Sequence, residues 1–230
     1  MEVINVKVKF IEGILGTASN NKEIYSEFIA SKAPDAMSAE EEVAAVGVNE
    51  VVEKGTTVFP RTEDGRPFLY DYQIKGFFKD TCGMLNKLTG KDEVTGKKKA
   101  AVNASSKITA FKKVVDGLIF VQPRKIPFVY DGEITICQRP LRGQTAQGER
   151  IALASSEEIP AGATIEFQIL CMSADHVAAV IEWLDYGFFR GIGQWRNSSK
   201  GRFCYEATDS AGNVIGSTME IGDAYMKDAV

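Results

Sequence analysis

The stretch "GIGQWRNSSKGRF", residues 191–203, decides the fold because of what stands on either side of it. Before it, "ADHVAAVIEWLDYGF" (174–188) repeats apolar residues at helical spacing, and after it "GRFCYEATDSAGNVIGSTMEI" (201–221) has the pattern of a hairpin around Ala-Gly-Asn. A helix therefore precedes the loop and a strand follows it. A dinucleotide-binding glycine loop needs the opposite order, and a Walker loop needs a Gly-Lys-Ser/Thr that this stretch lacks, so both are excluded.

The segment from Asp71 to Leu88 is predicted to be an amphipathic helix, because its apolar residues recur at steps of three and four. Lys75 and Lys79 fall on its polar side. "INVKVKF" (4–10) alternates apolar and polar residues, which predicts a half-buried strand. Three more apolar runs are predicted to be strands: "VVDGLIFVQP" (114–123), "GEITICQRP" (132–140) and "GATIEFQILCM" (162–172).

The strongest elements follow one another as strand, helix, strand, strand, helix, strand. That is the β-α-β-β-α-β order of the ferredoxin-like fold, which RRM domains share, so we expect an α+β protein with this core. The chain from 1 to 230 is predicted to be a single domain with large insertions at about 11–70 and 122–162. Within the first insertion, residues 20–30 and 38–53 have helical patterns.

The composition is that of a soluble globular protein, with 230 residues of which 44% are hydrophobic and 25% are charged. No apolar run approaches the roughly 18 residues that a membrane helix needs, and "MEVINVKVKF" is not a signal peptide. Widely spaced cysteines without a C-x-x-C pair favour free thiols, a cytoplasmic location and no zinc site. They are Cys82, Cys137, Cys171 and Cys204.

The net charge of −4 hides two basic blocks. Residues 75–125 hold 12 Lys and Arg against 4 acids, a balance of +8, and residues 186–203 hold 4 cations and no acid. By contrast, residues 151–185 carry 6 acids and no Lys or Arg. A single Lys-rich run such as 91–99 is typical of a solvated loop, but two separate basic blocks in an acidic chain favour a polyanionic partner.

The loop 191–203 has two interpretations. It can be a long connection that needs glycines only for their positive φ angles, in which case Trp195 belongs to the core. Alternatively, its cations and exposed backbone N–H groups hold phosphates while Trp195 and Phe203 stack on bases.

Three segments carry a family resemblance. "GIGQWRNSSKGRF" looks like the C-terminal glycine-rich loop, and "FLYDYQIKGFFKDTCGML" (68–85) resembles the turn, Leu/Ile-Lys-Gly signature and basic helix, of the RAMP superfamily. Residues 136–169 resemble the two-stranded excursion before the third core strand in these ferredoxin-fold proteins of CRISPR effector complexes. The resemblance implies a cytoplasmic, RNA-binding subunit of an antiviral ribonucleoprotein.

Such a subunit would bind single-stranded RNA, which could be a guide RNA, and associate with itself along the strand or with other effector subunits. The resemblance places phosphate contacts on the helix lysines and the glycine-rich loop, and contacts to the neighbouring strand or subunit on residues 137–150. The candidate nucleic-acid-binding residues are Lys75, Lys79, Arg139, Arg142, Arg190, Gly191, Gly193, Trp195, Arg196, Lys200 and Arg202.

The sequence argues against catalysis. His176 is its only histidine, so an imidazole acid/base pair or a nucleophilic triad cannot form, and its place at a helix start favours a cap or surface role. A paired-carboxylate metal site has candidates only in Asp64, Asp71 and Asp80. We expect binding without chemistry, metal or cofactor. The alternatives are a structural or anti-defence protein of a mobile element that uses the fold for protein contacts, and a metal-dependent endoribonuclease.

Overall fold

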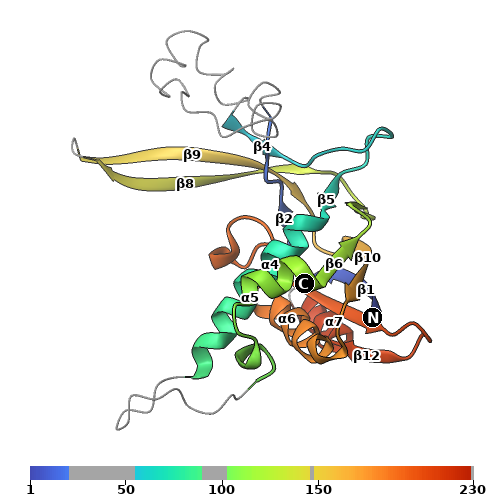
Figure 1. Cartoon of the computed structure of the whole chain (residues 1–230). Helices are drawn as coiled ribbons and strands as arrows, with labels where there is room; N and C mark the ends of the chain where they lie inside the picture. The colour runs from blue at the N-terminus through green and yellow to red at the C-terminus, as the bar shows by residue number, and fades with distance from the viewer. Residues whose placement is uncertain (21–54, 90–102, 146–147, 229–230) are drawn as a thin grey trace.

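The computed structural model describes residues 1–20, 55–89, 103–145 and 148–228. At its centre is a five-stranded antiparallel sheet in the order β12-β11-β1-β10-β6 (Figure 1). In chain order its strands are β1 (Glu2–Phe10), β6 (Ile119–Gln122), β10 (Thr164–Cys171), β11 (Phe203–Thr208) and β12 (Val214–Ser217).

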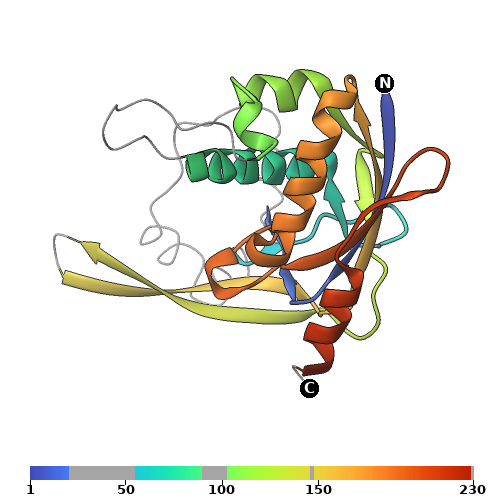
Figure 2. The same cartoon turned by 90° about the horizontal axis from the view of Figure 1, so that it is seen from below.

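Two helices, α4 (Asp71–Leu85) and α6 (Val177–Arg190), lie together on one side of this sheet (Figure 2). In sequence, α4 lies between β1 and β6, and α6 between β10 and β11. Without the added strand β12, the order β11-β1-β10-β6 is the 4-1-3-2 order of a ferredoxin-like core. The predicted α+β fold is therefore confirmed.

The core forms where apolar faces of the sheet and the helices meet. On β1, every second residue from Ile4 to Phe10 is buried, while the residues between them are more exposed, as strand alternation requires. Phe78 of α4 and Trp183 of α6 pack with ring centroids 5.3 Å apart. The indole N–H of Trp183 donates to Oγ of Ser105, 2.9 Å away, which ties η2 (Ser105–Lys107) to α6.

Strands inserted between the core elements build two further sheets. β2 (Ile14–Leu15), β3 (Ala18–Ser19) and β4 (Thr57–Val58) join a long hairpin that projects from the body of the protein (Figure 1). The hairpin consists of β8 (Thr135–Thr145) and β9 (Gly148–Ile159), and β5 (Phe68–Tyr70) pairs with β7 (Lys125–Pro127). The single-domain boundaries stay a prediction, and the helical patterns at 20–30 and 38–53 lie, after Asn20, outside the described residues.

Several predicted boundaries were wrong. The first half of 114–123 is helical, because α5 (Phe111–Leu118) precedes β6 and buries Val115 fully. The hairpin expected over 201–221 forms, but its end belongs to α7 (Met219–Asp228). The helix expected to reach residue 88 ends at Leu85 and continues as η1 (Asn86–Thr89).

The described residues include two further short helices, η3 (Ala174–His176) before α6 and η4 (Arg196–Ser198) within the loop that follows α6. Within the described residues, no helix is both long and apolar enough to span a membrane.

Candidate nucleic-acid interface

The loop between α6 and β11 has a backbone that requires its glycines. Gly191, Gly193 and Gly201 have φ angles of 72°, 90° and 73°. A Cβ at Gly201 would lie 1.9 Å from the carbonyl oxygen of Ile192, whose own N–H donates to the Gly201 carbonyl at 2.9 Å. Gly201 also donates to the carbonyl of Gly13 at 2.9 Å. The loop is therefore closed on itself and fixed to the core.

Two residues of the loop that are not glycine, Trp195 and Ser199, also have positive φ angles, 52° and 64°. Each such angle costs of order 1–3 kcal/mol, and strain of this kind concentrates at functional sites. Trp195 is 38% exposed, so the interpretation that makes it a core residue is wrong.

Asp80 of α4 holds two arginines beside the loop. Its Oδ2 accepts hydrogen bonds from Nε of Arg190 at 3.0 Å and from Nη1 of Arg196 at 2.6 Å. Burial raises the pKa of Asp80, but the hydrogen bond from Arg190 and the charges of Arg196 and Arg190 outweigh it, and the net pKa is lowered. Two guanidinium groups share one carboxylate, which leaves one positive charge uncompensated.

The lysines predicted on the polar side of α4 lie on its other flank. Nζ of Lys79 pairs with Oδ1 of Asp116 at 2.6 Å, and Nζ of Lys75 donates to the carbonyl oxygen of Asp116 at 3.1 Å. Lys75 also lies over the Phe120 ring, 5.1 Å from its centroid. Of these two lysines, only Lys79 is paired with the Asp116 carboxylate, whereas Lys75 contacts a neutral backbone carbonyl. The predicted faces of this helix are confirmed as far as Leu85, whereas Leu88, which the spacing placed on the buried face, is 66% exposed.

Between these flanks runs the exposed face of α4. At 100° per residue, Tyr72 and Gly76 lie opposite the buried side of the helix, and a Cβ at Gly76 would meet nothing within 4 Å. We call this face, together with its four flanking cations, the basic strip. Those cations are Lys75, Lys79, Arg190 and Arg196.

Arg139 of β8 reaches the same loop from the long hairpin. Its guanidinium lies over Trp195, 5.4 Å from the ring centroid, and its Nη2 donates to Oε1 of Gln194 at 2.6 Å. Gln194 in turn donates to the carbonyl of Gly16 at 2.9 Å. Nε and Nη1 of Arg139 are buried and have no hydrogen-bond partner within the described part of the chain. Both donors are therefore unsatisfied in this arrangement of the hairpin and the loop.

Other predicted contacts have internal roles. Lys200 pairs with Glu158 at 2.6 Å, and both side chains are largely buried. The guanidinium of Arg202 lies against the rings of Phe188 and Tyr225, 5.1 and 4.9 Å from their centroids, and these two rings also contact each other edge-on. We therefore assign Arg202 to the packing of α7 and not to phosphate. The side chain of Arg142 lies outside what the structure describes.

Phe203 cannot stack on a base, because it is fully buried. A Cβ at Gly187 would lie 2.0 Å from its ring, so the strand and α6 meet there at close range.

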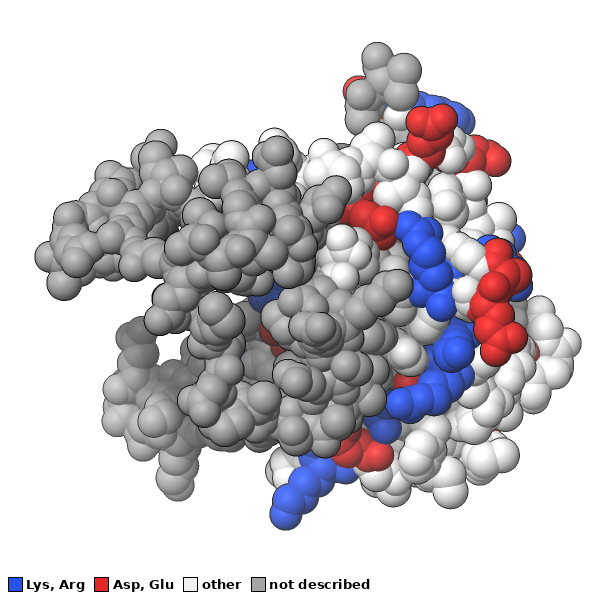
Figure 3. Space-filling model, turned by 90° about the horizontal axis from the view of Figure 1, so that it is seen from above, with Lys and Arg blue, Asp and Glu red and all other residues white. Residues whose placement is uncertain are grey.

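Across the described part of the face seen from above, Lys and Arg lie beside Asp and Glu (Figure 3). Among the described cations of the two basic blocks, Lys79, Arg190, Arg196 and Lys200 each pair with an acid.

Each of the three carboxylates considered for a metal site forms ion pairs with different arginines. Asp64 pairs with Arg66 at 2.6 Å, Asp71 with Arg124 at 3.4 Å, and Asp80 with Arg190 and Arg196. Asp71 and Asp80 are about 13 Å apart along α4. No group of three His, Cys, Asp or Glu placed to hold a metal ion occurs within the described residues.

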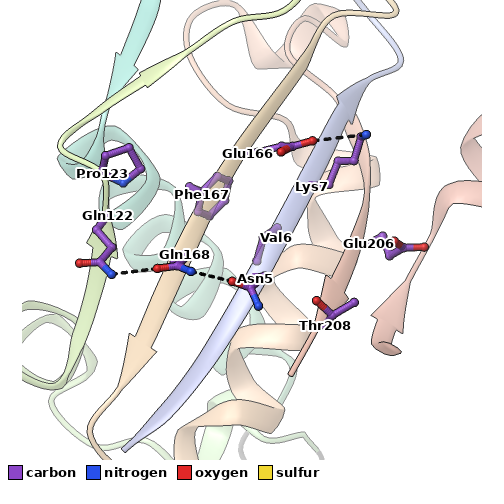
Figure 4. Close-up of a pocket in the computed structure, with 10 residues that line it drawn as sticks. All are labelled: Asn5, Val6, Lys7, Gln122, Pro123, Glu166, Phe167, Gln168, Glu206 and Thr208. Atoms are coloured by element: carbon purple, nitrogen blue, oxygen red, sulfur yellow. Dashed lines mark hydrogen bonds and ion pairs between the residues drawn. The ribbon is translucent and has the colours of Figure 1, made fainter. Parts of the chain in front are cut away.

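The opposite face of the central sheet carries a pocket of about 590 Å³ with different chemistry (Figure 4). Gln122, Gln168 and Asn5 form a ladder across three strands, with hydrogen bonds of 2.9 and 2.8 Å. RRM domains bind RNA through aromatic side chains on their sheet. Here the exposed positions of the sheet that line the pocket carry the amides of this ladder. The lining includes one lysine and two glutamates, so its net charge is negative. The helical face and loop are therefore the better candidate for a polyanion.

No family model matches the sequence, and no curated protein does. Among solved structures the chain is similar to one described as "Cryo-EM structure of the Type III-B Cmr-beta bound to cognate target RNA", with a TM-score of 0.45 and 10% identity. The match covers 88% of this chain and 57% of that chain, so this chain spans little more than half of its length. Because the TM-score is below 0.5, the class of this protein rests on its own topology. It is an α+β protein with a ferredoxin-like core and a basic, glycine-rich loop between α6 and β11.

Proposed function

We propose that this protein binds the sugar-phosphate backbone of single-stranded RNA, without catalysis, as a subunit of a RAMP-type CRISPR effector-like assembly. The observation that supports this is the meeting of three features at one loop. They are the basic strip on α4, the strained glycine-rich backbone, and the Arg139–Trp195 pair, whose guanidinium has two buried donors without a hydrogen-bond partner.

The cations of the strip are only partly neutralised by acidic side chains, so they can bind phosphate. A phosphate oxygen accepts charge-assisted hydrogen bonds from arginine, often two at once. Arg190 and Arg196 share a single carboxylate at 3.0 and 2.6 Å, so one of their two positive charges is not neutralised within the cluster. A bound phosphate would neutralise it. Trp195 offers a partly exposed ring for a base, and stacking on such a ring does not depend on sequence.

Salt dependence tests this proposal directly. The full chain is titrated into labelled single-stranded RNA at several salt concentrations, and the affinity is measured by fluorescence anisotropy. If about five cations engage, log K against log [salt] should slope near −3 to −4. A flat response would refute phosphate binding. Magnesium-dependent shortening of the RNA in the same samples would favour the endoribonuclease, and no binding at all would favour the protein-contact alternative.

Self-association is the second part of the proposal. The β8–β9 hairpin projects from the body and exposes Ile136 and Leu153, which are 56% and 70% exposed (Figure 1). Apolar side chains on a projecting hairpin suit a contact with a neighbouring subunit. Light scattering of the protein with RNAs of increasing length should then show one further copy for each added increment of length. A fixed stoichiometry of one would contradict assembly along the strand.

A further inference from the structure

An aromatic and basic cluster lies at the N-terminal end of α4, on the β5–β7 ribbon. The rings of Tyr70 and Tyr72 stack with centroids 5.1 Å apart and 17° between their planes, and Phe68 meets Tyr70 edge-on at 4.8 Å. Arg124 lies over the Tyr70 ring, 5.7 Å from its centroid, and Nζ of Lys125 lies 5.6 Å from the centroid of Phe68. Three rings and two cations are thus joined in one cluster.

Tyr72 is the outermost ring of this cluster. It is 56% exposed even though it stacks on Tyr70, whereas Phe68 is buried. Its position on α4 is opposite the buried Ile74 and Phe78, so the ring cannot turn into the core. The fold holds a large aromatic ring in solvent, with a second ring behind it.

The cations of the cluster are more available than those of the loop. The side chain of Arg124 is 72% exposed, and its pairing with Asp71 is long, at 3.4 Å. Lys125 forms no salt bridge with any residue that the structure describes. A polyanion approaching Tyr72 therefore meets positive charge that is weakly compensated.

The cluster is continuous with the basic strip. Tyr72 and Gly76 follow one another on the exposed face of α4, and Lys79 flanks this face two helical turns, about 10 Å, from Tyr72. At Gly76, where no side chain projects, a bound strand could pass from one to the other.

We propose that Tyr72 is a base-stacking position, and that the ligand of the basic strip is therefore a single strand with accessible bases and not a duplex or a base-free polyanion. This inference rests on the proposed function and extends it to the class of ligand. Stacking on an aromatic ring requires an unpaired base, since a paired base already stacks on its neighbours. Arg124 and Lys125 contribute the charge that holds the adjoining phosphate.

Two probes of equal length and charge test this. One is a labelled single-stranded RNA, and the other is an abasic ribose-phosphate strand. Wild-type protein should bind the RNA more tightly than the abasic strand. Tyr72→Leu should weaken RNA binding about 5- to 100-fold and leave affinity for the abasic strand unchanged, whereas Tyr72→Phe should bind both like wild type. Phe189→Leu, which removes an aromatic that is 69% exposed on α6, is the matched control and should change neither.

The possible outcomes separate this inference from the proposed function. If wild type binds both probes with a steep salt slope and Tyr72→Leu has no effect, the stacking position is refuted while phosphate binding stands. An equal loss on both probes, or a matching loss in Tm, would show that Tyr72 only supports local packing. If wild type binds neither probe, the function and the inference fall together.

Discussion

Asp80→Asn provides a sharp test of the basic strip, because Asp80 is the carboxylate that Arg190, at the end of α6, and Arg196 of the loop share. The substitution keeps the shape of the side chain and one acceptor oxygen but removes its charge. Arg190 and Arg196 then present two uncompensated charges in place of one. We expect the variant to bind single-stranded RNA more tightly and to be less stable.

The magnitudes follow from Coulomb's law and from the exposure of the pair. A phosphate bound to these arginines would lie roughly 6–8 Å from the Asp80 carboxylate, so removing that repulsion is worth about 0.5–2 kcal/mol, a two- to thirty-fold gain in affinity. The salt slope should steepen by about 0.7. The three side chains are 23–28% exposed, so the lost ion pairs should lower stability by about 1–2 kcal/mol, or Tm by roughly 2–8 °C.

Anisotropy titrations at several salt concentrations and thermal melts at several pH values measure both effects. The folded pKa of Asp80 lies below its ordinary value of 3.8, so its ionised form stabilises the fold above that pH, and this contribution disappears as the pH falls through the lowered pKa. The variant should lack this part of the acid dependence. Weaker RNA binding with an unchanged salt slope would refute the reasoning, because it would mean that the arginines do not face the ligand.

Three further substitutions test other parts of the interface. Lys79→Ala leaves the Asp116 carboxylate unpaired beside the strip, so the affinity should fall and the salt slope become shallower by about 0.7, with Tm unchanged. Gly193→Val should abolish binding even at low salt, because a β-branched residue resists a φ of 90°. Its control is Gly65→Val, at a φ of 82° in a remote turn, which should lower stability by a similar amount but keep RNA binding. Trp195→Ala should cost about 1–3 kcal/mol in affinity at constant salt slope, and a drop in Tm that accounts for the whole loss would count against stacking.

Periodicity was sufficient to predict the long elements of the fold. The apolar steps from Ile74 to Leu85 correspond to the buried side of α4, and alternation along 4–10 corresponds to β1. It failed at 114–123, where an apolar run is compatible with either strand or helix. Val115 is buried against the core from a helix, and only tertiary packing decides that.

The cations of the interface could be predicted from the sequence, but the acidic residues that neutralise them could not. The sequence shows two basic blocks, yet the carboxylate that binds Arg190 and Arg196 is Asp80, 110 and 116 residues away along the chain. The counting of charges in blocks cannot detect pairs that the fold brings together. The same holds for Arg202, which lies against two rings, one of them on α7, a helix that the hairpin pattern concealed.

The packing of α7 also provides an internal reporter of local opening. Gly222 of α7 lies so close to Cys204 of β11 that a Cβ there would be 2.4 Å from the sulfur, and burial raises the pKa of this thiol. A thiol reagent can reach Cys204 only after α7 has lifted from the sheet. Cys171, within the core and with a pKa raised by burial to about 11, should react only on global unfolding. The labelling rate of Cys204 relative to that of an unprotected thiol, corrected for thiolate fraction, would therefore measure the free energy that docks the last helix, and its ratio to the Cys171 rate would give the gap between local opening and global unfolding.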